Sequence, residues 1–157
     1  MKKIVVCSLL IFILVLQNGS IVSASEKSAQ PNELFDITQY HGKVVYLDFW
    51  ASWCVPCRKS FPWMNQLRQT YTTEQLIVIA VNLDKKRALA EKFLKENPAN
   101  FEIIYDPKGQ LAKHYAIKGM PSSVIFDKTG KPVIAHTGFF TKKINQYEQE
   151  IRNIVIK

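Results

Sequence analysis

The chain has 157 residues, of which 47% are hydrophobic, 22% charged and 11% aromatic. These are ordinary values for a globular protein, and they exclude a wholly disordered, collagen-like or coiled-coil chain. The length suits one domain that buries a substantial core. Three cysteines are too few for a disulfide-dense scaffold, and the net charge of +8 is modest and assigns no function by itself.

The first 24 residues have the three-part pattern of a secretory signal peptide. A basic start at residues 1–3 precedes an apolar run over residues 4–16, and small residues lead to Val-Ser-Ala at 22–24. This pattern predicts cleavage after Ala24. An uncleaved membrane anchor stays open, although the run is shorter than the roughly 20 residues that span a bilayer. Lipidation stays open as well, although Cys7 lies near the start of the run and not at its end.

Export would divide the three cysteines. Cys7 leaves with the signal peptide, so Cys54 and Cys57 are the only thiols of the expected mature chain, and the loss of two lysines lowers its net charge to +6. Residues 25–33 are polar and without periodicity, which is typical of a flexible tail. Residues 34–157 are the expected folded domain. In an oxidising compartment such a pair of thiols either forms a disulfide or is kept reduced by a partner.

Beyond the tail, short apolar runs alternate with amphipathic segments. Strands are expected at residues 43–50, 76–81, 101–105, 123–126 and 132–137. Helices are expected at residues 54–71, 85–97, 110–115 and 142–155. Pro62 is expected to kink the first helix, and Leu89, Phe93 and Leu94 are expected to face inward from the second. The order β-α-β-α-β-α-β-β-α predicts an α/β protein with a mixed central sheet and helices on both faces.

The chemistry is concentrated at Trp53-Cys54-Val55-Pro56-Cys57, between the first strand and the first helix. A cysteine at a helix N-terminus faces unpaired N–H groups and the positive end of the helix dipole, which favour its thiolate. Two intervening residues bring the second thiol within bonding reach. Cys54 can therefore attack a disulfide, and Cys57 can resolve the mixed disulfide that results.

Three other uses of the cysteine pair stay open. Zinc needs four ligands, and the chain adds only the scattered histidines His41, His114 and His136. A purely structural disulfide would close a loop too short to constrain the unfolded chain much. Copper(I) suits two soft thiolates.

Asp48 is an acid inside an apolar strand. Burying it is costly unless it is paired, and it is then a candidate for a functional role; the alternative is that its side chain faces water.

Residues 48–59, which read DFWASWCVPCRK, resemble the active-site segment of thioredoxin-fold proteins. The form Phe-Trp-Ala-Ser-Trp-Cys is similar to the exported TlpA/ResA/CcmG-like thiol:disulfide oxidoreductases. Residues 78–82 resemble the second strand of this family, and residues 119–123 resemble its cis-proline loop. The helix and strand of residues 85–104 resemble the insertion that separates the family from plain thioredoxin. The resemblance covers residues 35–156 and implies a thioredoxin fold with a TlpA/ResA-type helix-strand insertion.

The resemblance also implies roles for particular side chains. Met120 and Pro121 would be joined by a cis peptide packed against the disulfide, and their backbone would pair with an incoming substrate strand. Asp48 would be the buried acid that accepts a proton from the resolving cysteine. Trp53 would cover the surface at the active site, whereas Trp50 would pack beneath it.

Two departures from the family pattern bear on function. Some members carry a glutamate just after the second strand, where this chain has Asp84 followed by Lys85 at the expected position. That difference weakens a transfer of the cytochrome c maturation role. The dipeptide Val55-Pro56 differs from the Pro-His of strong oxidants, which argues against a disulfide-donating enzyme. It resembles the TlpA type, which reduces copper-delivery and oxidase-assembly proteins.

The expected function is therefore that of an exported protein-disulfide reductase with no cofactor other than its own disulfide, Cys54–Cys57, and no metal. It would work in the periplasm or on the outer face of the envelope. Its partners would be disulfide-bearing substrates, including copper-delivery or cytochrome assembly proteins, and a membrane thiol transporter of the DsbD/CcdA type as reductant. The alternative is a dithiol module that binds copper(I) for delivery. Nucleic acid is not expected, because basic and aromatic residues are not interleaved.

Overall fold

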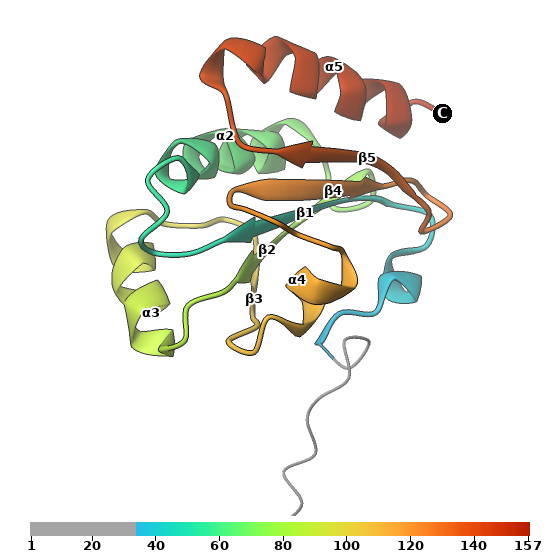
Figure 1. The fold of residues 1–157 in the computed structure, drawn as a ribbon. Helices are drawn as coiled ribbons and strands as arrows, with labels where there is room; N and C mark the ends of the chain where they lie inside the picture. Colours follow the sequence, from blue (N-terminus) through green and yellow to red (C-terminus); the bar gives the residue numbers. More distant parts are fainter. Residues whose placement is uncertain (1–33) are drawn as a thin grey trace, which may run out of the picture.

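Two apolar runs form the adjacent strands β1 (Val44–Trp50) and β2 (Leu76–Asn82) of a five-stranded sheet, in a computed structural model that describes residues 34–157 (Figure 1). The expected signal peptide (1–24), the expected tail (25–33) and Cys7 lie outside the described residues. Every residue of β1 is buried, as expected for a central strand that is covered on both faces. Within the described part, none of the helices combines the length and the hydropathy that crossing a membrane would require.

The sheet is mixed, as predicted. The remaining strands are β3 (Glu102–Tyr105), β4 (Ser122–Phe126) and β5 (Pro132–Thr137). The strand order is β3-β2-β1-β4-β5, in which β1, β2 and β3 run parallel while β4 and β5 are antiparallel additions. This arrangement confirms the thioredoxin-like topology, with the helix and strand between β2 and α4 inserted as the resemblance implied.

Helices cover both faces of the sheet. They are α2 (Cys57–Thr70), α3 (Arg87–Glu96), α4 (Gln110–His114) and α5 (Ile144–Val155), with short 3₁₀ turns η1 (Ile37–Tyr40) and η2 (Thr141–Lys143). In Figure 1, α2 and α5 lie on one side of the sheet, and α4 lies on the other with η1. Phe93 of α3 packs against Trp50 and Phe61, with ring centroids 4.8 and 5.0 Å away, so α3 joins the α2 side.

Two details of the helices differ from the expectation. Helix α2 begins at Cys57 and not at residue 54, because Cys54 lies in a preceding turn whose carbonyl accepts the Cys57 N–H. Leu89 of α3 is 46% exposed, so its expected inward position is wrong. Ala90 and Phe93, three residues apart, form the buried stripe instead. Helix α2 continues through Pro62, and the kink stays a prediction.

The alternation of β1 places its side chains in two separate cores. Val44, Tyr46 and Trp50 join the core on the α2 side, which also contains both cysteines. Val45, Leu47 and Phe49 join the core on the α4 side. Asp48 lies in register with the first set, because successive strand residues alternate between faces. The pattern of β1 therefore directs its one acid toward the face that carries the cysteines.

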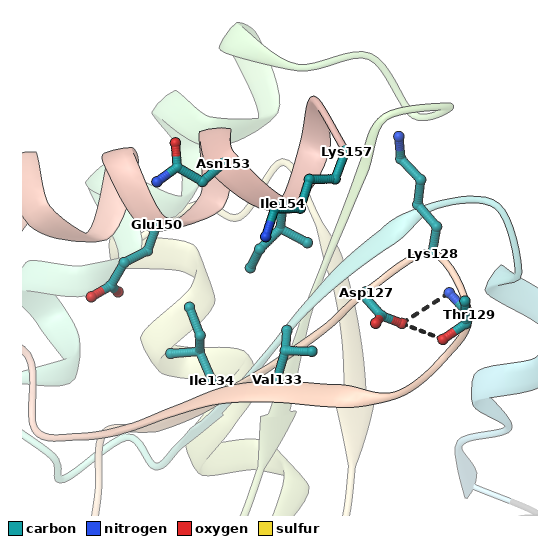
Figure 2. A pocket seen from close by; sticks show the side chains of 9 residues that line it. All are labelled: Asp127, Lys128, Thr129, Val133, Ile134, Glu150, Asn153, Ile154 and Lys157. Carbon is teal, nitrogen blue, oxygen red and sulfur yellow. Dashed lines mark hydrogen bonds between the residues drawn. The ribbon is translucent and has the colours of Figure 1, made fainter.

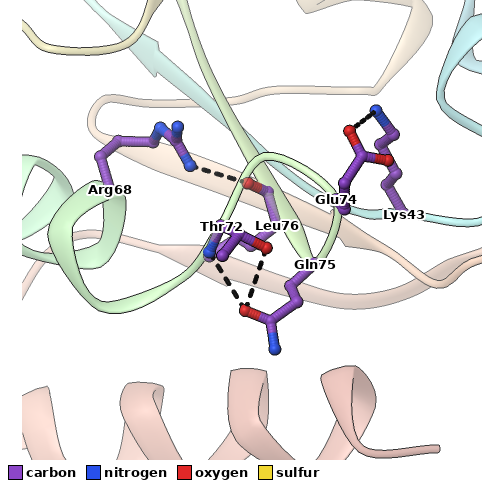
Figure 3. A network of polar contacts seen from close by, with 6 residues as sticks. All are labelled: Lys43, Arg68, Thr72, Glu74, Gln75 and Leu76. Atoms are coloured by element: carbon purple, nitrogen blue, oxygen red, sulfur yellow. Dashed lines mark hydrogen bonds and ion pairs between the residues drawn. The ribbon is translucent and has the colours of Figure 1, made fainter.

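The turn from α2 into β2 is held by side chains at the far end of the helix from the cysteines (Figure 3). Arg68 donates through Nη1 to the carbonyl oxygens of Tyr71 and Leu76, at 3.3 and 3.0 Å. The side-chain oxygen of Gln75 accepts from the backbone N–H and the hydroxyl of Thr72. These bonds fix where β2 starts. The pairing of β2 with β1 then brings the end of β2 beside the active-site loop.

Candidate active site

Cys54 and Cys57 form a disulfide at the end of β1, with their Cα atoms 5.3 Å apart. Cys57 is the first residue of α2 and has no exposed surface, whereas Cys54 retains 4%. The neighbours of Cys54 project outward, since Trp53 is 68% and Val55 67% exposed. The two sulfurs therefore differ in access. Another protein can approach the disulfide from the Cys54 side, whereas Cys57 lies beneath Cys54.

A buried carboxylate holds the loop in front of the disulfide. Asp84 accepts the Ser52 N–H through Oδ2 and the Ser52 hydroxyl through Oδ1, both at 2.9 Å. Asn82, the last residue of β2, donates from Nδ2 to Oδ2 of the same carboxylate at 2.8 Å, and accepts the Asp84 N–H. Both residues are almost completely buried. The end of β2 thus fixes the backbone two residues before Cys54.

Asp48 lies in the middle of β1 and is 1% exposed, so the alternative that it faces water is wrong. Burial raises the pKa of this carboxyl well above its usual range. Its Oδ2 atom is buried and accepts no hydrogen bond from the residues described. A carboxyl in this setting holds a proton at pH values where an exposed one has lost it.

The segment before β4 passes beside the same core. The Met120–Pro121 peptide is cis, as the resemblance implied. Met120 packs against the core that contains both cysteines, and the Pro121 carbonyl accepts the Gly138 N–H at 2.7 Å. Gly138 holds this contact with φ of +81°, a conformation that favours glycine. Phe140, two residues further on, is 49% exposed.

The two tryptophans of the motif have the opposite environments that the resemblance implied. Trp50 is fully buried and contacts Phe61 edge-to-face, with ring centroids 4.8 Å apart. Trp53 projects from the loop and is 68% exposed. The exposed side chains beside Cys54 are therefore apolar, which is the character of a surface that binds other proteins.

The sequence suggests six site residues, whose roles stay predictions, and it does not reveal what surrounds them. The sequence marks Asp84 only as a departure from a family pattern, although an acid just beyond a buried strand is a signal for a buried hydrogen-bonding role. Lys85, at the position expected for a glutamate, donates to the Pro107 carbonyl at 2.8 Å. Between residues 34 and 157, no group of three or more His, Cys, Asp or Glu side chains is arranged to hold a metal ion.

A pocket of about 490 Å³ lies away from the disulfide, between the β4–β5 turn and the end of α5 (Figure 2). Its walls include Val133 and Ile134 of β5, with Glu150 and Ile154 of α5. None of the six proposed site residues lines it. The chemistry of the cysteines therefore belongs to the exposed surface around Cys54 and not to this hollow.

Comparison with known proteins agrees with this geometry. The family model described as Redoxin matches residues 17–151. The thiol-disulfide oxidoreductase ResA of Geobacillus thermodenitrificans is 34% identical over 117 residues, covering 74% of this chain and 67% of that protein. The ResA of Bacillus subtilis is 28% identical over 130 residues, covering 78% and 73%.

Solved structures show the same likeness. A Chlorobium tepidum protein assigned as thiol:disulfide interchange protein DsbE has a TM-score of 0.73 and 48% identity, covering 76% of this chain and 84% of that one. StoA from Bacillus subtilis has a TM-score of 0.60 and 29% identity, covering 69% and 82%. The chain therefore belongs to the Redoxin family, as a thioredoxin-fold protein of the TlpA/ResA/CcmG-like branch, whose activity is thiol:disulfide interchange.

Proposed function

We propose that this protein is an exported reductase of protein disulfides that works through the Cys54-Val55-Pro56-Cys57 site. The observation that carries the proposal is the asymmetry of the disulfide. Cys54 lies at a surface with exposed apolar neighbours, and Cys57 lies buried on the face of the sheet toward which Asp48 is directed. One thiol is placed to meet a substrate, and the other is placed to act after it.

The reduced enzyme would act in two displacements. The Cys54 thiolate attacks one sulfur of a substrate disulfide, breaking that bond and releasing the other substrate sulfur as a thiolate. Cys57 then loses its proton to Asp48 and attacks the Cys54 sulfur. The mixed disulfide breaks, the substrate leaves fully reduced, and the two enzyme sulfurs carry the oxidation as the Cys54–Cys57 disulfide.

Local charge supports the first displacement. The first turn of α2 contains no acidic residue, so the positive end of the helix dipole is not offset there. Arg58 and Lys59 follow Cys57 and add positive potential near the sulfurs. Both influences favour the thiolate form of a cysteine over its thiol.

Substrate proteins would dock on the surface around Cys54. Trp53 supplies exposed apolar area, and the backbone at Met120 and Pro121 would pair with an extended substrate segment. The Val55-Pro56 dipeptide, which resembles that of the TlpA type, supports copper-delivery or oxidase-assembly proteins as substrates. A membrane thiol transporter of the DsbD/CcdA type would return the enzyme to its reduced form. The protein would work with these partners in the periplasm or on the outer envelope face.

Reduction of insulin disulfides, together with a redox titration, tests the proposal. The wild-type protein should accelerate insulin reduction by dithiothreitol, and Cys54→Ser should abolish that acceleration. The redox potential of the wild-type disulfide should lie well below the approximately −120 mV of the strong oxidant DsbA. A protein that binds copper(I) stoichiometrically and shows no reductase activity would instead be the delivery module, and a potential near that of DsbA would indicate a disulfide donor.

A further inference from the structure

A row of polar side chains leads from Asp48 across the sheet toward solvent. Asp48 of β1 pairs in register with Ser123 of β4, and Ser123 pairs with His136 of β5. Directly paired residues of antiparallel strands point to the same face, with Cβ atoms about 4.5–5.5 Å apart. These three residues therefore form one cross-strand row on the face that α2 and α5 cover.

The outer part of this row is already in contact. The Ser123 hydroxyl lies 3.5 Å from Nδ1 of His136. On the other side of the ring, Nε2 of His136 lies 2.9 Å from Oε2 of Glu150 in α5. That oxygen receives no directed hydrogen bond, and its contact with the ring becomes an ion pair when the imidazole is protonated.

The outer end of the row meets solvent. The side chain of His136 is 19% exposed and that of Glu150 is 25% exposed. Glu150 also lines the pocket at the end of α5, and Figure 2 shows it on the same helix as Asn153 and Ile154. The row thus begins at a carboxyl with almost no exposure and ends at a side chain that is 25% exposed, although the Glu150 oxygen that faces the ring is buried.

We propose that Ser123, His136 and Glu150 form the path by which the proton taken up by Asp48 leaves the protein during each catalytic cycle. The inference rests on the proposed function, since it requires Asp48 to accept the Cys57 proton. It goes further by giving roles to a serine, a histidine and a glutamate for which the reaction itself has no use.

The transfer balances as a relay. Asp48 returns its proton to the Ser123 oxygen while the Ser123 hydroxyl proton passes to Nδ1 of neutral His136. The resulting imidazolium is held by the Glu150 carboxylate and releases its Nε2 proton to water. An imidazole suits this step because one nitrogen accepts a proton while the other donates one. Asp48 is then a carboxylate again, and no electrons move.

The remaining groups that face this row do not offer a competing exit. Tyr46 of β1 is buried beside Ser123, and burial raises the pKa of its hydroxyl well above the usual range, with the charge of Asp48 adding to the effect and a hydrogen bond with Ser123 opposing it. Tyr147 of α5 is buried, and its ring centroid lies 4.8 Å from that of His136. On α2, Trp63 contacts Tyr46 and cannot carry a proton between acids.

A multiple-turnover experiment with the full chain tests the path, because Asp48 must return its first proton before it can accept a second. The protein turns over an excess of a disulfide-containing peptide and dithiothreitol, and the formation and the resolution of the mixed disulfide are timed separately at steady state between pH 5.5 and 9. His136→Asn and Ser123→Ala should slow resolution by about a hundredfold or more, the lower end of what a lost proton transfer typically costs. Formation should keep its wild-type rate, and Glu150→Gln should shift the pH profile of resolution alone.

Two comparisons separate a proton path from a structural role. His114→Asn changes an exposed histidine on α4 and should leave both steps unchanged. Added imidazole should accelerate resolution in His136→Asn and not in the wild type, because the buffer replaces the missing ring. The inference is overturned if His136→Asn resolves as fast as His114→Asn, if it slows both steps equally, or if imidazole gives no rescue. If the wild-type protein fails to form the mixed disulfide at all, the proposed function fails instead.

Discussion

The carboxylate of Asp84 holds the loop before the disulfide, and its removal should weaken both the fold and the site. Asp84 accepts three hydrogen bonds, two from Ser52 and one from Asn82, at 2.8–2.9 Å. Asp84→Ala removes the acceptor and leaves the buried donors unsatisfied. Asp84→Asn keeps one oxygen for the Ser52 N–H and Asn82, while its amide can donate to the Ser52 hydroxyl, which turns to accept.

The magnitudes follow from these bonds. A hydrogen bond to a charged group contributes about 1.5–3 kcal/mol to the free energy of unfolding. Bonds that share one carboxylate are not additive, so we expect Asp84→Ala to lower that free energy by about 3–5 kcal/mol in total. Asp84→Asn loses the charge and keeps the pattern, and should lower it by only about 1 kcal/mol. Typical domains have about 5–15 kcal/mol in all, so the alanine change is severe.

Urea unfolding of the oxidised protein gives the stability values, and insulin reduction gives the activity. Asp106→Ala is a matched control, because Asp106 is equally buried and accepts three backbone N–H groups at the start of α4. Both alanine variants should lose comparable stability. At temperatures where both are folded, only Asp84→Ala should lose reductase activity. Equal activity of the two variants, or a stability loss below 1 kcal/mol for Asp84→Ala, refutes this role of the carboxylate.

Three further changes test other parts of the account. Because burial raises the pKa of Asp48, ionisation of this carboxyl opposes folding. As the pH rises above the pKa of Asp48 in the unfolded chain, the wild type should therefore lose stability relative to Asp48→Asn by about 1.4 kcal/mol per pH unit. The loss should end once the pH passes the pKa of Asp48 in the folded protein. Unfolding curves from pH 4 to 9 check this, and a constant difference contradicts it. Trp53→Ala should raise the KM for peptide disulfides and change stability by less than about 0.5 kcal/mol, whereas the buried Trp50→Ala should cost about 3–5 kcal/mol. Gly138→Ala should lower the free energy of unfolding by roughly 1–2 kcal/mol and reduce activity, because φ is +81° and the added Cβ would lie 3.0 Å from the Phe140 ring. An unchanged melting temperature would contradict this prediction.

Much of the fold could be predicted because its signals are local. The apolar runs of β1 and β2 indicate strands covered on both faces, and the alternation of elements indicates a mixed sheet between helices. The start of α2 could not be placed as well, because a turn closed by the Cys54 carbonyl has no distinct sequence pattern. The inward position predicted for Leu89 is wrong because helical periodicity permits several stripes through Phe93, and the packing of α3 buries Ala90 with it instead.

The cysteines of the candidate site could be predicted from their spacing, and the roles of Asp48 and Pro121 followed only from the family resemblance. The partners of Asp84 could not be predicted, since its bonds to Ser52 join segments 32 residues apart. The placement of His136 depends on the register of two antiparallel strand pairs, which no local pattern specifies. Residues in contact across a sheet thus escape sequence reasoning even where each strand is evident.

The central claim is that Cys54 attacks substrate disulfides and the buried Cys57 resolves the mixed disulfide. Trapping of covalent complexes measures this most directly: Cys57→Ser and Cys54→Ser are each expressed, and complexes that dithiothreitol dissociates are counted on non-reducing gels. Cys57→Ser should accumulate mixed disulfides with substrate proteins, and Cys54→Ser should accumulate none. Equal trapping by the two variants, or trapping by Cys54→Ser alone, contradicts the account.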